Sequence, residues 1–167
     1  MDNNDFITRL DETTNDILQI VNKFTIERLN YKQGESWNVL EIIEHLYLTD
    51  KVIYTIISRP SETINSSTEI VGKEAIQKVI VEQRREKITS PDILKPKGEI
   101  KDITILVDMF VNQRNTWKNS ISTSEILIDN RVHKHPFLGE MTISDWLNFA
   151  IHHSQRHFEQ IKDIINN

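Results

Sequence analysis

The chain has 167 residues, 38% of them hydrophobic, with only four glycines and four prolines. This is the length of one ordinary domain, and the scarcity of turn-forming residues favours long helices. Cysteine is absent and the net charge is −5, which excludes disulfides, thiolate ligands and the basic surface that nucleic-acid binding requires. We therefore expect an all-α protein with a single domain over residues 1–167 and no nucleic-acid partner.

The first ten residues, MDNNDFITRL, are acidic and contain no apolar run. They match neither a signal peptide nor a transit sequence, and no stretch approaches the ~20 apolar residues of a membrane span. The sequence thus predicts a cytoplasmic protein with no membrane partner.

Two helices are predicted in the first third of the chain. Residues 4–30 carry apolar side chains at steps of three and four, which indicates one helix, and a glycine-containing turn follows at 31–36. A second helix begins at Asn38, because Asn38 and Glu41 have the spacing of a capping box, and it ends before Pro60. His45 lies among apolar residues on the inward side of this helix. Taken alone, it is typical of a core histidine.

The middle of the chain predicts a long crossover and a third helix. Residues 58–71 are polar and form a loop, Lys73 to Lys87 can form a short extra helix, and residues 89–98 contain two prolines and a glycine. The third helix runs from about Asp102 to Ile121. The crossover lets the second and third helices run parallel.

Residues 122–140 form a link with a short extended piece predicted at 125–128. His133 and His135 lie in this link, followed by Pro136. Two interpretations of His135 stand side by side. It is either part of a turn packed against the last helix, which we favour for both histidines, or a wall of a pocket mouth.

The last helix is the most informative segment. Thr142 and Asp145 have the spacing of a second capping box. The stripe that follows contains two histidines four residues apart, and it consists of Trp146, Phe149, Ala150, His153, His157, Ile161 and Ile164. His152 falls on the adjoining polar flank, and we expect it to be exposed.

Two neighbouring imidazoles on an apolar face need partners, since an unpaired buried polar group costs on the order of 1–3 kcal/mol. His153 and His157 have metal-ligand spacing, but the zincin glutamate is missing between them, so a zincin-type protease is excluded. The alternatives are a pair of hydrogen-bonded core histidines and a metal site. His45 would supply a third nitrogen from a facing helix.

Two segments together resemble the DinB-like superfamily. They are SWNVLEIIEHL, which contains Trp37 and His45, and HPFLGEMTISDWLNFAIHHSQRHFEQI, which matches the branch with an HP-x-x-G-x-[LM]-T segment before the last helix. The resemblance implies an up-down-down-up four-helix bundle, usually a homodimer. It also implies a divalent transition metal held by His45, His153 and His157.

The resemblance implies an enzyme as well. Three imidazoles leave a metal with an open position, and Zn, Ni, Fe, Co and Mn all suit nitrogen ligands. Members of the superfamily include transferases that use low-molecular-weight thiols such as bacillithiol or mycothiol, and a thiol-dependent maleylpyruvate isomerase. We expect activation of a thiol for transfer to a small electrophile, ahead of activation of water for hydrolysis. No catalytic residue is assigned, and Gln160, Glu41 and Glu44 are candidates to support the histidines.

The alternative is a non-catalytic helical dimer with a metal-stabilised core and a stress-related or interaction role. Solvent access separates the two hypotheses. A metal site at the floor of an open pocket favours an enzyme, whereas a sealed site favours a structural role.

Overall fold

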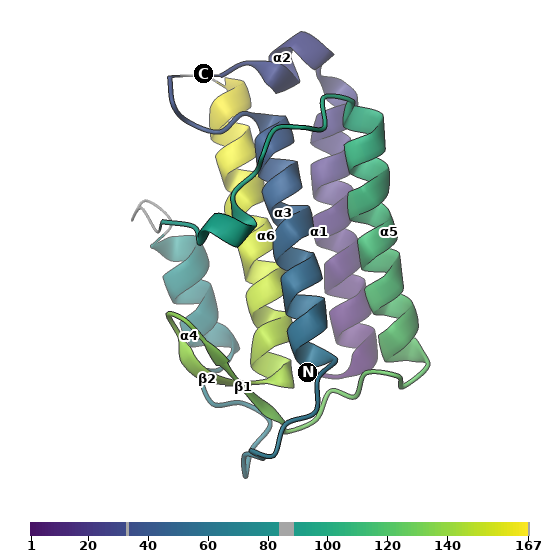
Figure 1. Ribbon diagram of the computed structural model, residues 1–167, viewed down its shortest axis with the longest axis vertical. Coiled ribbons are helices and arrows are strands. Elements are labelled where there is room, and N and C mark those ends of the chain that lie inside the picture. The colour runs from purple at the N-terminus through teal and green to yellow at the C-terminus, as the bar shows by residue number, and fades with distance from the viewer. Residues whose placement is uncertain (33, 84–88, 167) are drawn as a thin grey trace.

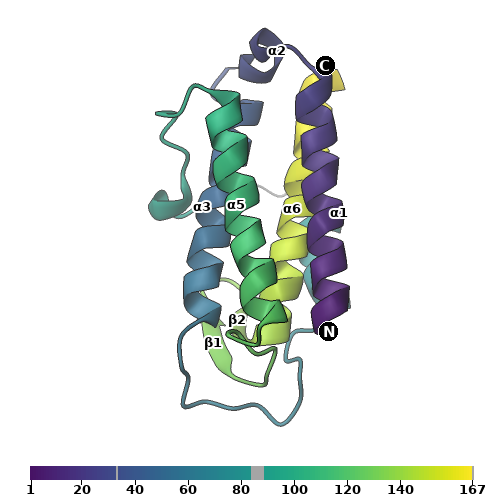
Figure 2. The same ribbon diagram turned by 90° about the vertical axis from the view of Figure 1, so that its right-hand side faces the viewer.

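Four long helices lie side by side in the computed structural model, which describes residues 1–32, 34–83 and 89–166 (Figure 1). They are α1 (Asn3–Lys23), α3 (Val39–Ile57), α5 (Ile103–Ser122) and α6 (Ile143–Asn166). Helices α1 and α6 run in one direction, and α3 and α5 run in the other (Figures 1 and 2). The predicted all-α class is confirmed, with one small two-stranded sheet added to it.

The predicted helix starts are made by side-chain caps. Asn38 accepts a hydrogen bond from the Glu41 backbone N–H, and the Glu41 carboxylate accepts one from the Asn38 N–H, so the capping box of α3 is complete. Asp102 caps α5 by accepting from two backbone N–H groups of its first turn. Each cap satisfies donors that have no partner within the helix.

The prediction of one helix over residues 4–30 was wrong. Helix α1 ends at Lys23, and a separate short helix α2 (Ile26–Asn30) follows. The Thr25 side chain accepts from the Arg28 backbone N–H and so begins a new helix. The Arg28 guanidinium then donates to the carbonyl oxygens of Ile164 and Ile165, at 3.0 and 2.8 Å, where the negative end of the α6 dipole favours a cation.

The crossover between α3 and α5 contains helix α4 (Lys73–Gln77), a π-helical turn η1 (Lys78–Glu82) and a 3₁₀ turn η2 (Asp92–Leu94). The predicted short helix begins at Lys73 as expected, and its last part, residues 84–87, lies outside the described residues. Helix α4 and turn η1 pack on α6, whereas η2 packs on α3. The crossover therefore reaches both helices that carry the candidate histidines.

A β-hairpin precedes α6, and its strands are β1 (Val132–His135) and β2 (Gly139–Thr142). They pair antiparallel, with Val132 opposite Thr142 and His135 opposite Gly139. The short extended piece predicted at 125–128 was wrong, because the described backbone forms no strand there. Gly139 closes the three-residue turn with a φ of 76°, a conformation that suits glycine.

The start of α6 fastens the crossover to the hairpin. The Asp145 carboxylate accepts from the backbone N–H groups of Ile70, Val71 and Gly72 at 2.8–3.2 Å. It also accepts from the Thr142 N–H, and Thr142 Oγ1 accepts from the Asp145 N–H, so the second predicted capping box is present. One carboxylate thus ties a distant segment to the helix that carries two of the three histidines.

The interior consists of two apolar clusters, one on each side of a polar layer. Phe6, Ile53, Trp117 and Trp146 belong to one cluster, and Ile17, Ile43, Phe110 and Ile161 belong to the other. Between them along the helices lies the buried ion pair of Arg114 and Asp50, joined at 2.8 Å. Within the described residues, no helix is both long enough and apolar enough to cross a membrane.

Candidate metal centre

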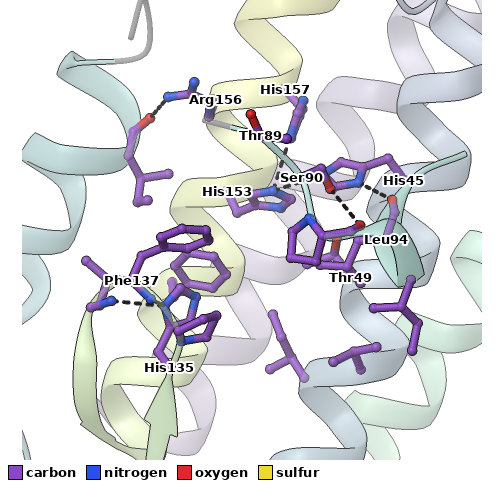
Figure 3. Close-up of a pocket in the computed structure, with 18 of the residues that line it drawn as sticks. His45, Thr49, Thr89, Ser90, Leu94, His135, Phe137, His153, Arg156 and His157 are labelled. Carbon is purple, nitrogen blue, oxygen red and sulfur yellow. Dashed lines mark hydrogen bonds between the residues drawn. The ribbon is translucent and has the colours of Figure 1, made fainter. Parts of the chain in front are cut away.

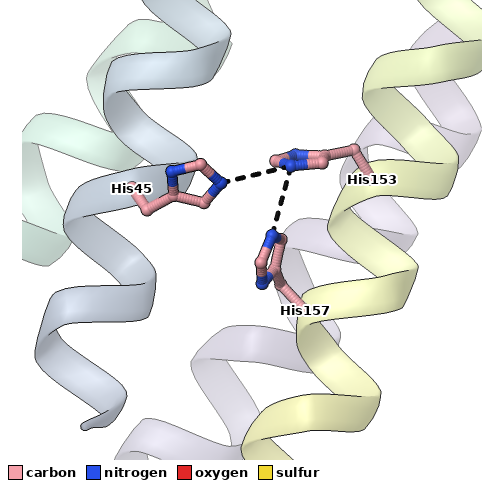
Figure 4. A group of neighbouring side chains, drawn as sticks. All are labelled: His45, His153 and His157. Carbon is pink, nitrogen blue, oxygen red and sulfur yellow. Dashed lines mark hydrogen bonds between the residues drawn. The ribbon is translucent and has the colours of Figure 1, made fainter. Parts of the chain in front are cut away.

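Three histidines from two facing helices meet at one point (Figure 4). His45 comes from α3, and His153 and His157 come from successive turns of α6. The Nε2 atom of His153 lies 3.2 Å from Nε2 of His45 and 3.1 Å from Nε2 of His157. One nitrogen from each ring lies within 4.8 Å of the others, an arrangement that can hold a metal ion.

Hydrogen bonds on the far side of two rings fix which nitrogen carries the proton. His45 Nδ1 lies 2.7 Å from the Leu94 carbonyl oxygen, which can only accept, so Nδ1 donates. His157 Nδ1 lies 2.8 Å from Gln160 Oε1 and donates to it in the same way. In the neutral ring, the other nitrogen is then unprotonated. Both Nε2 lone pairs are therefore aimed at His153.

The electrostatics of the cluster keep all three rings neutral. Burial lowers the pKa of His45, and burial, with the neighbouring His45 ring as a smaller cause, lowers the pKa of His157 to about 3. Burial also lowers the pKa of His153 well below its usual range, and the two other histidines add to this effect. Neutral imidazoles are the form that binds metals.

The three nitrogens fit a divalent transition metal. A proton on His153 Nε2 can form a good hydrogen bond to only one of the two facing Nε2 lone pairs, those of His45 and His157. A cation between the three rings would bind all three nitrogens. Zinc–nitrogen bonds of about 2.0–2.1 Å in a tetrahedron place neighbouring nitrogens roughly 3.3 Å apart, close to the two separations that involve His153, 3.2 and 3.1 Å. The carbonyl and amide partners of His45 and His157 are the supports that metal-ligating histidines ordinarily have.

A pocket of about 1050 Å³ lies against this cluster (Figure 3). Its lining is largely apolar and includes the crossover residues 89–91 and 93–94, the hairpin turn 135–138 and both histidine-bearing helices. Ile93 and Phe137 line it and are 73% and 63% exposed, so part of the pocket wall faces solvent. Part of the His153 side-chain surface is accessible, whereas His45 and His157 are buried.

The supporting residues proposed from the sequence divide into two groups. Gln160 contacts His157, as the sequence suggested, whereas Glu41 and Glu44 do not contact the cluster through any hydrogen bond of the described residues. Glu41 completes the α3 cap, and Glu44 accepts from the backbone N–H groups of Lys97 and Gly98. The two glutamates therefore hold helix and crossover in place.

The expectation that His152 is exposed was wrong, since only 2% of it is accessible. Helix α1 covers this flank of α6, and His152 Nε2 lies 3.4 Å from the Arg9 guanidinium. His152 Nδ1 lies 2.7 Å from Gln155 Oε1, so its partners lie outside the three-histidine cluster. Its pKa is lowered, chiefly by burial.

The remaining candidates lie near the pocket or in the core. His135 forms part of the hairpin turn, as we favoured, and also lines the pocket, whereas His133 does not line it. Trp37 lines the pocket with its ring 4.9 Å from the His45 ring, and Trp117 is in the core.

Sequence reasoning missed two contributions to the site. Leu94 supports His45 through a backbone carbonyl, for which side-chain patterns carry no signal. Arg156 lines the pocket and donates to the Ile80 carbonyl at 3.0 Å. Its position between His153 and His157 on one helix was the available signal.

Comparisons with known proteins agree with this geometry. The chain is 23% identical over 142 residues to the uncharacterized protein YuaE of Bacillus subtilis strain 168, with 83% of each chain covered. No solved structure matches it. Residues 9–161 match the sequence profile of the DinB superfamily, and the chain therefore belongs to that superfamily.

Proposed function

We propose that this protein is a metal-dependent enzyme in which His45, His153 and His157 hold one divalent transition metal. The observation that carries the proposal is the position of the cluster. Two Nε2 lone pairs are fixed toward a third imidazole at the wall of a pocket that reaches solvent. A purely structural metal site is usually closed by protein ligands, whereas three ligands leave an open position.

The protein's own groups prepare this site. The Leu94 carbonyl and the Gln160 amide fix the orientation of two rings, and the pocket walls beside the cluster are largely apolar. A metal bound there would lower the pKa of a bound thiol or water, or polarise a carbonyl. The reaction that we propose is transfer of a low-molecular-weight thiol to a small electrophile.

Two features favour a thiol over water as the nucleophile. Among the described residues that line the pocket, the single carboxylate is that of Glu35, and no hydrogen bond joins it to the histidines, so the described lining places no carboxylate beside them to activate water. The pocket also lies at the upper end of the about 300–1,000 Å³ that ligand sites commonly span. Its 1050 Å³ leaves room for a thiol beside an electrophile. Hydrolysis remains the second reaction to test.

Further parts of the proposal concern the architecture. We propose that the four long helices form an up-down-down-up four-helix bundle and that residues 1–167 are one domain. The opposed directions of the α1/α6 and α3/α5 pairs support the bundle.

Elemental analysis of the untagged protein is the first test of the metal site. We expect about one equivalent of a transition metal per chain in the wild type and its loss in the His153→Ala/His157→Ala variant. His133→Ala is the matched control, since it removes a histidine outside the cluster and should retain the metal. A metal-free wild type that gains no thermal stability from zinc, nickel, manganese or iron would exclude the metal site.

The second test is a thiol-conjugation assay with small thiols and electrophiles, run with and without the metal found. We expect conjugation only with metal present and only in the wild type and the control. A protein that binds metal, conjugates no thiol and hydrolyses model esters would favour the hydrolase instead.

A further inference from the structure

His135 occupies a position in the pocket that the metal centre does not explain (Figure 3). It is the last residue of β1 and is only 7% exposed. Its ring centroid lies 4.7 Å from that of Phe149 and 5.1 Å from that of Trp146, both on α6. The ring is therefore held firmly while its side chain lines the cavity.

The hairpin turn determines the tautomer of this ring. His135 Nδ1 accepts from the backbone N–H of Phe137 at 3.2 Å and from that of Leu138 at 3.1 Å. Both partners can only donate, so Nδ1 is unprotonated. Burial lowers the pKa of His135 to about 4, and the ring is neutral at pH 7. A neutral imidazole with a bare Nδ1 carries its proton on Nε2.

The Nε2–H group of His135 is an unused donor. No described residue accepts a hydrogen bond from it. Among the described residues, the side-chain nitrogen and oxygen atoms that are fully buried and lack a partner are Thr49 Oγ1, Trp117 Nε1 and His133 Nε2, so His135 Nε2 is not fully buried. It is therefore reachable from the pocket. A donor in largely apolar surroundings gains most from a partner, because few waters compete for it.

Phe149 connects this donor to the metal centre. Its ring packs on His135 on one side, and its centroid lies 5.4 Å from that of His153, with the two planes only 21° apart. A flat apolar molecule lying along Phe149 can therefore reach His135 with one end and the three histidines with the other.

We propose that His135 binds the substrate, its Nε2–H donating to the carbonyl oxygen of a mostly apolar carbonyl compound whose reactive end faces His45, His153 and His157. A neutral donor suits a neutral oxygen, and the apolar walls suit the rest of the molecule. This inference rests on the proposed function, because it names the class of molecule that shares the pocket with the metal.

The test uses His135→Asn, which distinguishes the role of Nδ1 in the turn from the role of Nε2 in the pocket. An asparagine side-chain oxygen can accept from the backbone N–H two residues further along, so it can replace Nδ1 in the turn. It offers no group at the position of Nε2. The probes are acetophenone and ethylbenzene, which differ by a carbonyl oxygen and have nearly the same shape. Their dissociation constants are measured by NMR titration of wild type and variant, with the metal content of each batch determined.

We expect the preference for acetophenone over ethylbenzene to fall roughly tenfold in His135→Asn, the loss of one hydrogen bond. Long-range ¹H–¹⁵N spectra of the wild type should show His135 in the Nε2–H form, with its Nε2–H resonance shifting as acetophenone binds. An equal preference in wild type and variant, or His135 in the Nδ1–H form, overturns the inference. The spectra decide the question even if the variant fails to fold.

Failure of the proposed function would look different. A protein that neither contains nor responds to a transition metal, or a metal-loaded protein that neither conjugates thiols nor hydrolyses esters, refutes the metal-dependent enzyme. The acetophenone result is then read separately, since that probe needs no metal to meet His135.

Discussion

Replacing Asp50 by asparagine should destabilise the protein severely. Asp50 and Arg114 are each 1% exposed, and the Arg114 Nε donates to Asp50 Oδ2 at 2.8 Å. Burial raises the pKa of Asp50, and the facing guanidinium opposes that rise. Arginine stays protonated, so the guanidinium favours the charged form of the carboxylate that faces it. The substitution keeps the shape and leaves a buried cation without its counter-ion.

The size of the effect follows from this burial. Removing one partner of a buried pair costs about 3–5 kcal/mol. For a domain of this size, each kcal/mol lowers Tm by about 2–4 °C, so we expect a loss of roughly 6–20 °C. The hydroxyl groups of Thr13, Thr14 and Ser154 accept from Arg114 and soften the loss, but they carry no charge.

Urea and thermal unfolding of the metal-free protein measure the loss. Asp11→Asn is the matched control, because it breaks a 2.7 Å pair with Lys118 at the surface and should cost under about 1 kcal/mol. The double variant Asp50→Leu/Arg114→Met should recover most of the stability. The hydroxyls that it leaves behind keep their own bonds to helix carbonyls. A loss below 1 kcal/mol in Asp50→Asn would refute the reasoning.

Two further predictions concern the histidines. The folded-state pKa values of His135 and His157, about 4 and about 3, lie below the ordinary 6.5. The unfolded chain therefore binds these protons first as the pH falls. Unfolding free energy, measured in urea on the metal-free protein, should drop below pH 6.5 by up to about 1.4 kcal/mol per pH unit per histidine. In His135→Asn, the unfolding free energy should fall less steeply with decreasing pH, by the contribution of one histidine. Equal slopes in variant and wild type would contradict the lowered pKa of His135. Replacing Gln160 by leucine removes the acceptor of His157 Nδ1 and should weaken zinc binding roughly 10- to 100-fold in a competition titration. Glu159→Gln, which leaves that bond intact, should bind zinc like the wild type.

The reliable sequence predictions were those in which the signal is local. The capping boxes at Asn38 and Thr142 depend on side chains three residues apart, and both are present. The meeting of His45 with His153 and His157 depended instead on the pairing of two helices. Periodicity placed each histidine on an inward face, and the family resemblance brought the faces together.

The wrong predictions depended on contacts between distant segments. His152 lies on a face that looked polar, but Arg9 on α1 covers it. The hairpin was missed because its strands are short and are defined by pairing across a turn rather than by apolar alternation. The break at Thr25 was hidden because Leu29 continues the apolar period across it.

The anchoring of the crossover by Asp145 means that the histidines and the pocket wall are under different evolutionary constraints. The histidines lie on long helices whose packing is fixed by the core, whereas much of the pocket wall comes from the crossover and the hairpin turn. The first turn of α6 holds the crossover through the backbone N–H groups of Ile70, Val71 and Gly72, so this contact does not use their side chains, although the φ of 84° at Gly72 favours glycine there. The side chains of the pocket wall play no part in this anchor. We expect homologues to vary in the solvent-facing side chains of these segments more than in His45, His153 and His157.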